Sequence, residues 1–348
     1  MSPSNGGNPP PSRGLVTATV LFYLVAALAM VIANKWVLNQ TVVPLFFLFS
    51  QLVVAVILFL MAHAMGLLQL PMEIDLQVCK GLIPMVGLNV VGLSFSNYTL
   101  SYVDASFYPV ARGMVLPFTV VASFFFLNAR PSFLVLVTCA IVTVGFFIGV
   151  FLDAIPVSLT GIAFGVSSSL ITAVHSVVIK KSLDVVKGSA LHLSWYTNLL
   201  SSIVLIPIMV LAGEVPDIVD LLFGDNPAPS HGISLFTAFI LGSIVTGGIG
   251  FLMSIASLLS IKVTSPITHM VSSAVRGVAG SLLGKWIFKD IITTGRATSI
   301  AVILGGSVAY TWVKHNESQR PAPKFTSKSH YERVPLEEAE AGRAGKPE

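Results

Sequence analysis

The sequence predicts an all-α membrane protein with ten transmembrane helices arranged as a 5+5 inverted repeat. Three observations support this prediction: an apolar composition, a series of long stretches with few charges, and short internal repeats at similar spacings. Hydrophobic residues make up 54% of the 348 positions and charged residues only 10%. Soluble globular domains contain roughly 25% charged residues, so the composition excludes a water-soluble globule.

The predicted elements follow one another along the chain. Residues 1–14 are rich in Pro, Ser and Gly and are expected to form a disordered cytosolic segment. The membrane domain is predicted over 15–315, with 15–152 and 158–315 as its two repeats, and a disordered cytosolic tail over 316–348. Each apolar stretch is close to the roughly 17 to 25 residues that cross a hydrocarbon core of about 30 Å. The predicted spans are 15–36, 44–66, 80–100, 105–127, 132–152, 158–180, 189–212, 233–258, 265–288 and 297–314.

Weak internal matches occur in the same order in both halves of the chain. VIANKWVL at 31–38 matches VVIKKSLD at 177–184, FSQLV at 49–53 matches YTNLL at 196–200, and LSYVDAS at 100–106 matches LSIKVTS at 259–265. Because each copy then holds five helices, the second copy enters the membrane from the opposite face. Inverted repeats are typical of secondary transporters, which bind their substrate near the midplane. The alternative is chance similarity among apolar segments.

The positive charges predict the orientation of the chain. Ten spans place both termini on one side of the membrane. Fourteen of the 20 Lys and Arg residues fall on that side, and two lie within spans. The four on the opposite side are Lys35, Lys285, Lys289 and Arg296. Lys and Arg near span ends favour the cytosolic face, so both termini are predicted to be cytosolic. The net charge of +4 then reflects topology, and no nucleic-acid partner is expected.

Two arginines, Arg112 and Arg276, lie deep inside apolar spans, one in each repeat. A cation at this depth costs roughly 2.5 to 3.5 kcal/mol on insertion scales and usually faces a protein interior or a polar pathway. The pair therefore predicts a buried binding site for an anion. The alternative is that each arginine is a structural residue bonded to helix carbonyls.

Spacing places other polar side chains near these arginines. Tyr108 lies four residues before Arg112 and shares its helix face. His269 lies seven residues before Arg276, about two turns, and shares a face with Ser272. Each of these side chains either contacts an anionic substrate or packs between helices.

Five sequence motifs carry a family resemblance over about 15–315. They are NKWVL, SNYTLSYVDASFYPVARG, WYTN, KVTSPITHMVSSAVRG and GGSVAYTW. The chain resembles the nucleotide-sugar and triose-phosphate branch of the drug/metabolite transporter superfamily, and most closely the GDP-fucose transporters. This resemblance implies a Golgi or endoplasmic-reticulum antiporter that exchanges a cytosolic nucleotide-sugar for a luminal nucleoside monophosphate.

The resemblance also implies roles for individual residues. Arg112 occupies the arginine position of the fucose transporters, whereas Arg276 stands where they and the GDP-mannose transporters place a lysine. Tyr196 and Asn198 fall in the position of a motif that holds the sugar. Position alone adds Asn34 and Lys35, which close the first span and are candidate contacts at the luminal gate, although an interfacial lysine also serves as a snorkelling anchor. The arginine at position 276 is a departure from these relatives, because a guanidinium grips phosphate with two hydrogen bonds and an ammonium does not. The base and the sugar of the substrate therefore stay open.

Several functional classes are weighed against this interpretation. The alternatives within transport are a UDP-sugar such as UDP-galactofuranose, UDP-xylose or UDP-galactose, GDP-mannose, or a phosphorylated metabolite. A non-transporting membrane scaffold is the alternative outside transport. No enzyme is expected, because the acidic residues cluster in loops and the tail. Cys79 and Cys139 have no further ligands at metal spacing, so neither a metal nor a cofactor is expected. The expected partners are the lipid bilayer and the two nucleotides, with a homodimer possible.

Overall fold

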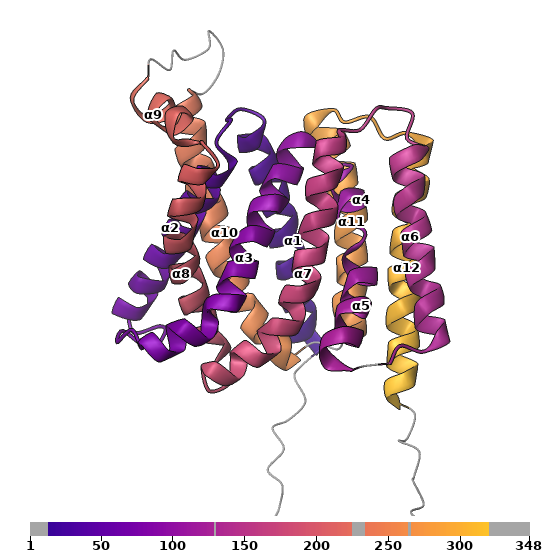
Figure 1. Ribbon diagram of the computed structural model, residues 1–348, viewed down its shortest axis with the longest axis horizontal. Helices are drawn as coiled ribbons and strands as arrows, with labels where there is room; N and C mark the ends of the chain where they lie inside the picture. Colours follow the sequence, from indigo (N-terminus) through magenta and orange to yellow (C-terminus); the bar gives the residue numbers. More distant parts are fainter. Residues whose placement is uncertain (1–12, 129, 225–233, 264–265, 320–348) are drawn as a thin grey trace, which may run out of the picture.

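The chain folds into helices over the residues that the computed structural model describes, 13–128, 130–224, 234–263 and 266–319 (Figure 1). Within these ranges, the side chains of 13–17, 19, 20, 180, 255–263 and 266–276 fall outside the description. The helices are α1 (Arg13–Leu38), α2 (Pro44–Ala64), α3 (Leu76–Tyr102), α4 (Tyr108–Ala111), α5 (Val115–Leu127), α6 (Phe133–Phe151), α7 (Leu159–Val185), α8 (Ala190–Leu211), α9 (Val215–Phe223), α10 (Leu235–Val263), α11 (Pro266–Phe288) and α12 (Thr294–Gln319). The predicted all-α class is confirmed.

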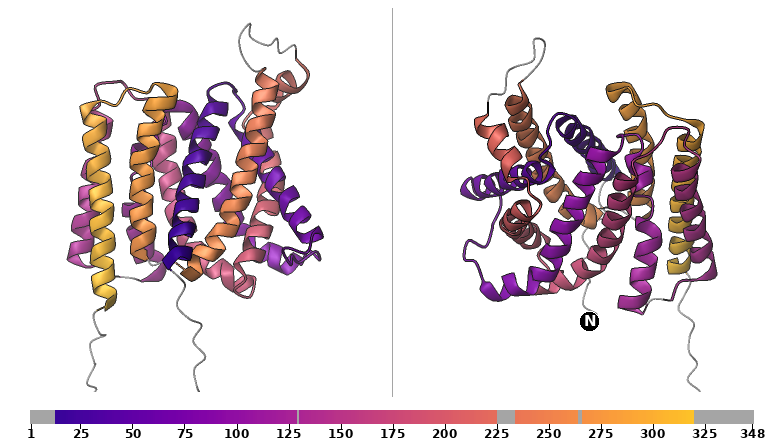
Figure 2. Two further views of the ribbon diagram at one scale, coloured as in Figure 1. Left: turned by 180° about the vertical axis from the view of Figure 1, so that it is seen from behind. Right: turned by 45° about the horizontal axis from the view of Figure 1, so that its top comes forward.

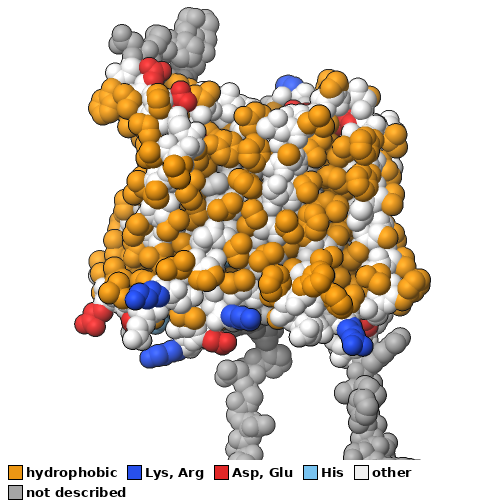
Figure 3. All heavy atoms as spheres, viewed as in Figure 1, with side chains coloured by type: hydrophobic (Ala, Val, Ile, Leu, Met, Phe, Trp, Pro, Cys, Tyr) orange, Lys and Arg blue, Asp and Glu red, His pale blue; other side chains and the backbone are white. Residues whose placement is uncertain are grey.

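The surface of the molecule suits a lipid bilayer. Within the described ranges, eight helical stretches are long and apolar enough to cross a membrane. Figure 3 shows hydrophobic side chains covering the flank of the molecule and charged side chains gathered at its two ends. Phe125, Phe133, Phe151 and Leu211 are each more than 70% exposed on this flank. Large exposed apolar patches are uncommon in soluble monomers, so this surface is the one that faces lipid.

The long helices run side by side, and the start of α1 and the end of α12 lie at the same end, the bottom of Figure 1. Helix α3 packs along α7, and α1 packs along α10, as Figure 2 shows from behind. Helices α2 and α8 contact each other and flank this centre. Helices α6 and α12 pair at the opposite edge. The central space is therefore surrounded by helices from both halves of the chain.

One predicted span is not a continuous helix. The stretch 105–127 is divided into α4 and α5 by a turn at 112–114. Pro109 and Pro117 lie in the first turns of the two pieces, where a missing N–H leaves no helical hydrogen bond unmade. The backbone N–H of Gly113 instead bonds to the carbonyl of Val110, three residues back, at 2.8 Å. This turn places Arg112 at a break in the helix.

The structure departs from the predicted boundaries at other places. The predicted linker after the seventh span contains the short helix α9, which carries acidic residues on one side and apolar residues on the other. Helix α12 continues to Gln319, beyond the predicted end at 314. Most of the two predicted disordered segments, 1–12 and 320–348, lies outside the described residues.

A buried carboxylate fixes the end of the molecule opposite the termini. Glu214, between α8 and α9, is 4% exposed and accepts hydrogen bonds from the backbone N–H groups of Leu45 and Phe46 at 3.0 Å. The hydroxyl of Tyr98 donates a third bond at 3.0 Å. Burial raises the pKa of Glu214, while these donors act in the opposite direction. The carboxylate thus caps the first turn of α2 and ties it to α3 and α9.

The substitution Glu214→Ala should lower the free energy of unfolding by about 1–3 kcal/mol, because it leaves buried donors of α2 and Tyr98 without an acceptor. Thermal unfolding of the purified protein in detergent measures this loss. Asp217→Ala is the matched control, since Asp217 is an exposed carboxylate on α9. Equal melting temperatures for the two variants would contradict the capping role.

Candidate functional site

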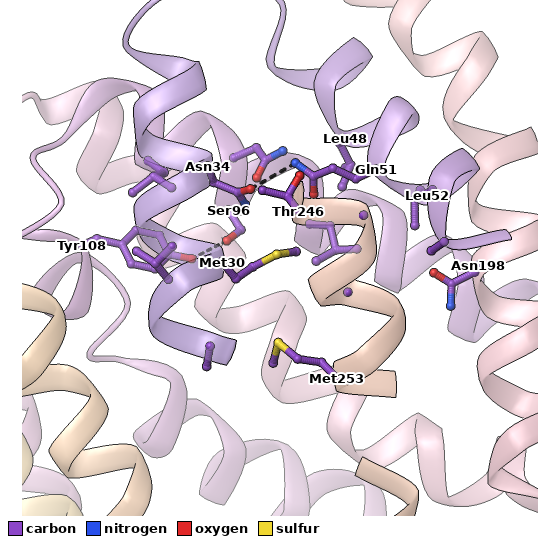
Figure 4. Close-up of a pocket in the computed structure, with 18 of the residues that line it drawn as sticks. Met30, Asn34, Leu48, Gln51, Leu52, Ser96, Tyr108, Asn198, Thr246 and Met253 are labelled. Atoms are coloured by element: carbon purple, nitrogen blue, oxygen red, sulfur yellow. Dashed lines mark hydrogen bonds between the residues drawn. The ribbon is translucent and has the colours of Figure 1, made fainter. Parts of the chain in front are cut away.

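A cavity of about 430 Å³ lies inside the bundle (Figure 4). Its walls come from α1, α2, α3, α8, α10 and the break between α4 and α5. The volume lies in the range of roughly 300–1,000 Å³ that is typical of small-molecule sites. Apolar side chains form most of the described lining, and its polar members include Asn34, Gln51, Ser96, Tyr108, Arg112 and Asn198. The described lining contains no carboxylate.

Arg112 is the only cation of the described lining, and neutral hydroxyls hold its guanidinium. One terminal nitrogen donates to the hydroxyl of Tyr108 at 3.1 Å and reaches Ser96 at 3.5 Å. The other donates to Thr172 at 2.9 Å. The buried Nε–H has no acceptor among the described residues. No carboxylate within the described ranges lies within ion-pair distance of Arg112. Its positive charge therefore has no counter-charge there.

Close helix packing brings these hydroxyls to the arginine. A side chain added at Gly165 of α7 would lie 2.6 Å from the carbonyl oxygen of Ala111, so only glycine permits this approach. Thr172 lies seven residues further along α7, two turns on and therefore on the same face. On the other side, Tyr108 and Ser96 are joined by a hydrogen bond of 2.6 Å. The guanidinium is thus oriented from α3, α4 and α7 by hydroxyl groups that leave its charge intact.

Arg296 is a useful contrast, because it is buried with its charge balanced. The sequence suggested a loop cation at this position, but the side chain is only 1% exposed. Its Nε donates to Asp153 at 2.9 Å and its Nη1 to Asp104 at 3.1 Å. Nη1 also donates to Ser106 at 2.6 Å, and the guanidinium lies over the ring of Phe107. Arg296 is therefore a structural residue that joins α12 to two loops.

The ion pair of Arg296 also acts on the titration of its partner. Burial by itself would raise the pKa of Asp153, but hydrogen bonds from Thr293, Arg296 and the backbone of Ile155 outweigh it and lower the pKa overall. The carboxylate therefore stays ionised and keeps the bridge intact.

The structure brings some of the predicted site residues together and separates others. Tyr108, Arg112 and Asn198 line the same cavity. Lys35 does not line it; its ammonium donates to the backbone carbonyls of Leu100 and Val103 at 2.9 and 2.7 Å. Lys35 is therefore bonded to the end of α3, and its predicted substrate contact stays a prediction.

Tyr196 also lies away from the cavity. The side chain is 3% exposed in a hydrophobic cluster between α2, α3 and α8. Its hydroxyl lies 3.4 Å from the carbonyl oxygen of Glu73. Arg276, His269 and Ser272 belong to α11, and their side chains lie outside the described residues. The predicted pairing of Arg112 with Arg276 stays a prediction.

Sequence reasoning missed three polar residues at this site. Thr172 and Ser96 hold Arg112, and Gln51 projects from α2 into the cavity wall. The available signal was a hydrogen-bonding side chain inside an apolar span, which usually faces another helix or a cavity. Spacing alone could not show which helix faces which.

Comparisons with known proteins find a family match and similar transporters, each covering most of the chain. Residues 14–311 match the model of the Triose-phosphate Transporter family. The mouse protein named GDP-fucose transporter 1 is 32% identical over 93% of this chain and 91% of its own length. A Drosophila melanogaster protein named "GDP-fucose transporter, Golgi" is 30% identical over 86% and 90%.

A fission-yeast relative and a solved structure extend this picture. An uncharacterized transporter of Schizosaccharomyces pombe is 30% identical over 89% of this chain and 78% of its own length. A crystal structure described only as that of a protein matches with a TM-score of 0.54 at 14% identity, over 88% of this chain and 99% of the other. The structural likeness shows a shared fold.

The two arginines should differ in their effect on stability. Arg296→Gln should cost about 3–5 kcal/mol, because it leaves the buried carboxylate of Asp153 without its partner. Arg112→Gln should leave stability unchanged or raise it, because it removes a buried charge that has no described counter-charge. Thermal unfolding of both variants in detergent tests this difference. A large loss for Arg112→Gln would show that Arg112 is structural.

Proposed function

The chain belongs to the Triose-phosphate Transporter family, and on this premise we propose that it is a nucleotide-sugar antiporter of the GDP-fucose type. It exchanges a cytosolic nucleotide-sugar for a luminal nucleoside monophosphate by alternating access. The single observation that carries this proposal is the guanidinium of Arg112, which lines the cavity and has no counter-charge among the described residues.

The charge of Arg112 explains why the substrate carries phosphate. A cation in a low-dielectric environment interacts strongly with an anion and weakly with neutral groups. The three hydroxyls around Arg112 orient it but cannot neutralise it. A nucleotide pyrophosphate, with about two negative charges, meets this need, and the guanidinium can grip its oxygens with paired hydrogen bonds. Arg276 of α11 is proposed to supply the second cation.

Relatives guide the choice of substrate. Proteins named as GDP-fucose transporters are 30–32% identical to this chain over most of its length. One of them carries the Golgi in its name. We therefore place this protein in the Golgi or endoplasmic-reticulum membrane, with GDP-fucose as the first substrate to test. UDP-sugars, GDP-mannose and phosphorylated metabolites are the alternatives that the same test separates.

The proposed mechanism depends on a 5+5 inverted repeat, for which helix boundaries offer support. Helices α2 and α8 begin 146 residues apart, at Pro44 and Ala190, and each is followed by a glycine with a positive φ, Gly66 and Gly213. Helices α3 and α10 begin 159 residues apart. These spacings are those of the sequence matches.

Helix packing supports the same repeat. If α1, α2 and α3 correspond to α7, α8 and α10, exchanging the halves turns the α3–α7 contact into α10–α1. The same exchange turns the α2–α10 contact into α8–α3, and all four contacts occur. Rocking of two such related halves about a central site would expose the cavity to each compartment in turn.

Exchange by purified protein tests the transport function. Proteoliposomes preloaded with GMP or UMP should take up labelled nucleotide-sugar of the matching base, and empty vesicles should take up little. Arg112→Ala should lower this exchange by at least about 100-fold, since removing one partner of a buried charge pair costs about 3–5 kcal/mol. Arg112→Lys should retain part of the exchange, because an ammonium restores the charge without the bidentate grip.

A matched arginine variant controls for general effects. Arg130→Ala removes an exposed arginine from the loop between α5 and α6 and should exchange at the unmodified rate. Arg276→Ala should behave as Arg112→Ala does. Normal exchange by both the Arg112 and Arg276 variants would contradict the anion site, and exchange of phosphorylated metabolites alone would replace the proposed substrate.

The proposed orientation places both termini in the cytosol. The test uses a variant without Cys79 and Cys139. In this background, a cysteine that replaces the exposed Lys181 should react with a membrane-impermeant maleimide in sealed Golgi vesicles. A cysteine introduced for exposed Asp217 should react only after detergent treatment, because the two positions lie at opposite ends of the bundle. The reverse pattern would show that the protein has the opposite orientation.

A further inference from the structure

Two buried amides form a second polar feature in the cavity wall, separate from Arg112. Gln51 of α2 donates from Nε2 to Oδ1 of Asn34 on α1 at 3.1 Å. The two residues are 5% and 9% exposed, and both line the cavity. Figure 4 shows them facing each other across the dashed hydrogen bond. Among the described residues, the Nδ2 of Asn34 and the Oε1 of Gln51 have no other hydrogen-bond partner.

The packing of α10 holds this amide pair in place. A side chain added at Gly247 would lie 2.9 Å from the backbone oxygen of Gln51 and 2.6 Å from Val54. The glycine therefore lets α10 press against α2 at the level of Gln51. Such close backbone packing limits the freedom of α2, so the amide pair presents a fixed edge to the cavity.

The free atoms of the pair have a defined hydrogen-bonding character. Asn34 uses its oxygen and Gln51 its nitrogen in the mutual bond, so Asn34 keeps its amide nitrogen as a donor and Gln51 keeps its oxygen as an acceptor. A planar ligand edge with one acceptor beside one donor matches such a pair. A single Asn or Gln binds the edge of a nucleobase with one donor and one acceptor, and here the two amides divide these roles between them.

The surroundings of the pair suit a flat aromatic ring better than a sugar. Met30 and Met253 also line the cavity, and both lie below Asn34 and Gln51 in Figure 4. Thioethers make favourable contacts with aromatic rings. Leu48 and Leu52 of α2 add apolar surface to the same wall. A sugar would place hydroxyls against these groups and leave them without hydrogen bonds.

Arg112 and the amide pair belong to different walls. Arg112 is held from α3, α4 and α7, whereas the amides come from α1 and α2. A ligand whose phosphate binds Arg112 can therefore present another part of itself to the amides.

We propose that the Asn34–Gln51 pair is the base-reading element of this carrier and binds the lactam edge of a nucleobase. This inference rests on the proposed nucleotide-sugar function and adds the part of the site that selects the base. The keto oxygen of the base accepts from Asn34 Nδ2, and the neighbouring ring N–H donates to Gln51 Oε1. Guanine, hypoxanthine and uracil carry this edge. Adenine and cytosine reverse both polarities, and anchoring of the phosphate at Arg112 prevents the ring from simply turning over.

Competition in the counterflow assay tests the proposal with defined probes: GMP, IMP, UMP, AMP, CMP and ribose 5-phosphate. In the unmodified protein, GMP and IMP should compete equally, because they share the lactam edge, and AMP should compete at least about tenfold more weakly. UMP is the probe that separates a pyrimidine from a purine site.

Substitution of the pair should remove selection of the base and spare binding of phosphate. Gln51→Met keeps the side-chain length but removes the acceptor. It should therefore weaken competition by GMP and IMP by at least about tenfold and leave competition by ribose 5-phosphate unchanged. Asn34→Asp replaces the donor by an acceptor and should reduce the difference between GMP and AMP in the strength of their competition. Gln40→Met is the matched control, because Gln40 is exposed beyond α1, and it should behave as the unmodified protein does.

The outcomes separate this inference from the transport function on which it rests. If the unmodified protein exchanges no nucleotide-sugar, the proposed function fails. If it exchanges but Gln51→Met keeps the ratio of GMP to ribose 5-phosphate competition, only the base-reading role fails. If Gln51→Met or Asn34→Asp no longer distinguishes two nucleotide-sugars that differ only in the sugar, while the ranking of the monophosphates stays unchanged, the pair contacts the sugar and not the base. Equal weakening of ribose 5-phosphate would show a merely structural role.

Discussion

The structure depends on one unbalanced charge inside an apolar bundle. Arg112 is held by three hydroxyls, and within the described residues no carboxylate pairs with it. Hydroxyls satisfy the N–H groups of a guanidinium but leave its charge unopposed, which is costly where the dielectric is low. Arg296, with two carboxylates, shows that this chain can balance a buried arginine when its role is structural. The absence of such balance at Arg112 among the described residues is the observation that supports the proposed anionic ligand.

Local backbone features then fix where this charge lies. The turn at 112–114 releases Arg112 from a regular helix, and the close approach of α7 at Gly165 brings Thr172 to it. Interrupted helices at membrane depth are tolerated where they line a cavity, because polar groups there find partners. The same break that weakens the helix thus creates the site.

Hydrophobic patterning predicted the parts of the structure that depend on local sequence. The all-α class, most span boundaries and the placement of Tyr108 beside Arg112 follow from apolar length and helical spacing. Patterning did not predict the contacts of a side chain whose partners lie on a distant part of the chain. Arg296 resembled a loop cation because its partners, Asp104 and Asp153, are more than 140 positions away. The hydrogen-bond partners of Lys35 were not predicted either, because the carbonyls that it binds lie at the end of another helix.

The polar contacts at the end opposite the termini complete the physical picture of a carrier. Lys35 joins the ends of α1 and α3, Ser281 of α11 donates to the carbonyl of Ser106 at 3.0 Å, and Asp290 accepts from the N–H of Ser106 at 2.8 Å. Together with Arg296 they add hydrogen bonds and ion pairs to the apolar cluster at this end, which includes Leu38, Leu100 and Leu221. Water can replace such bonds group by group when the helices part, whereas an opened apolar seal exposes surface with no compensating interaction. In the proposed transport cycle these polar contacts lower the cost of opening this end, and the charge of Arg112, which has no counter-charge among the described residues, holds the anion while the end opens.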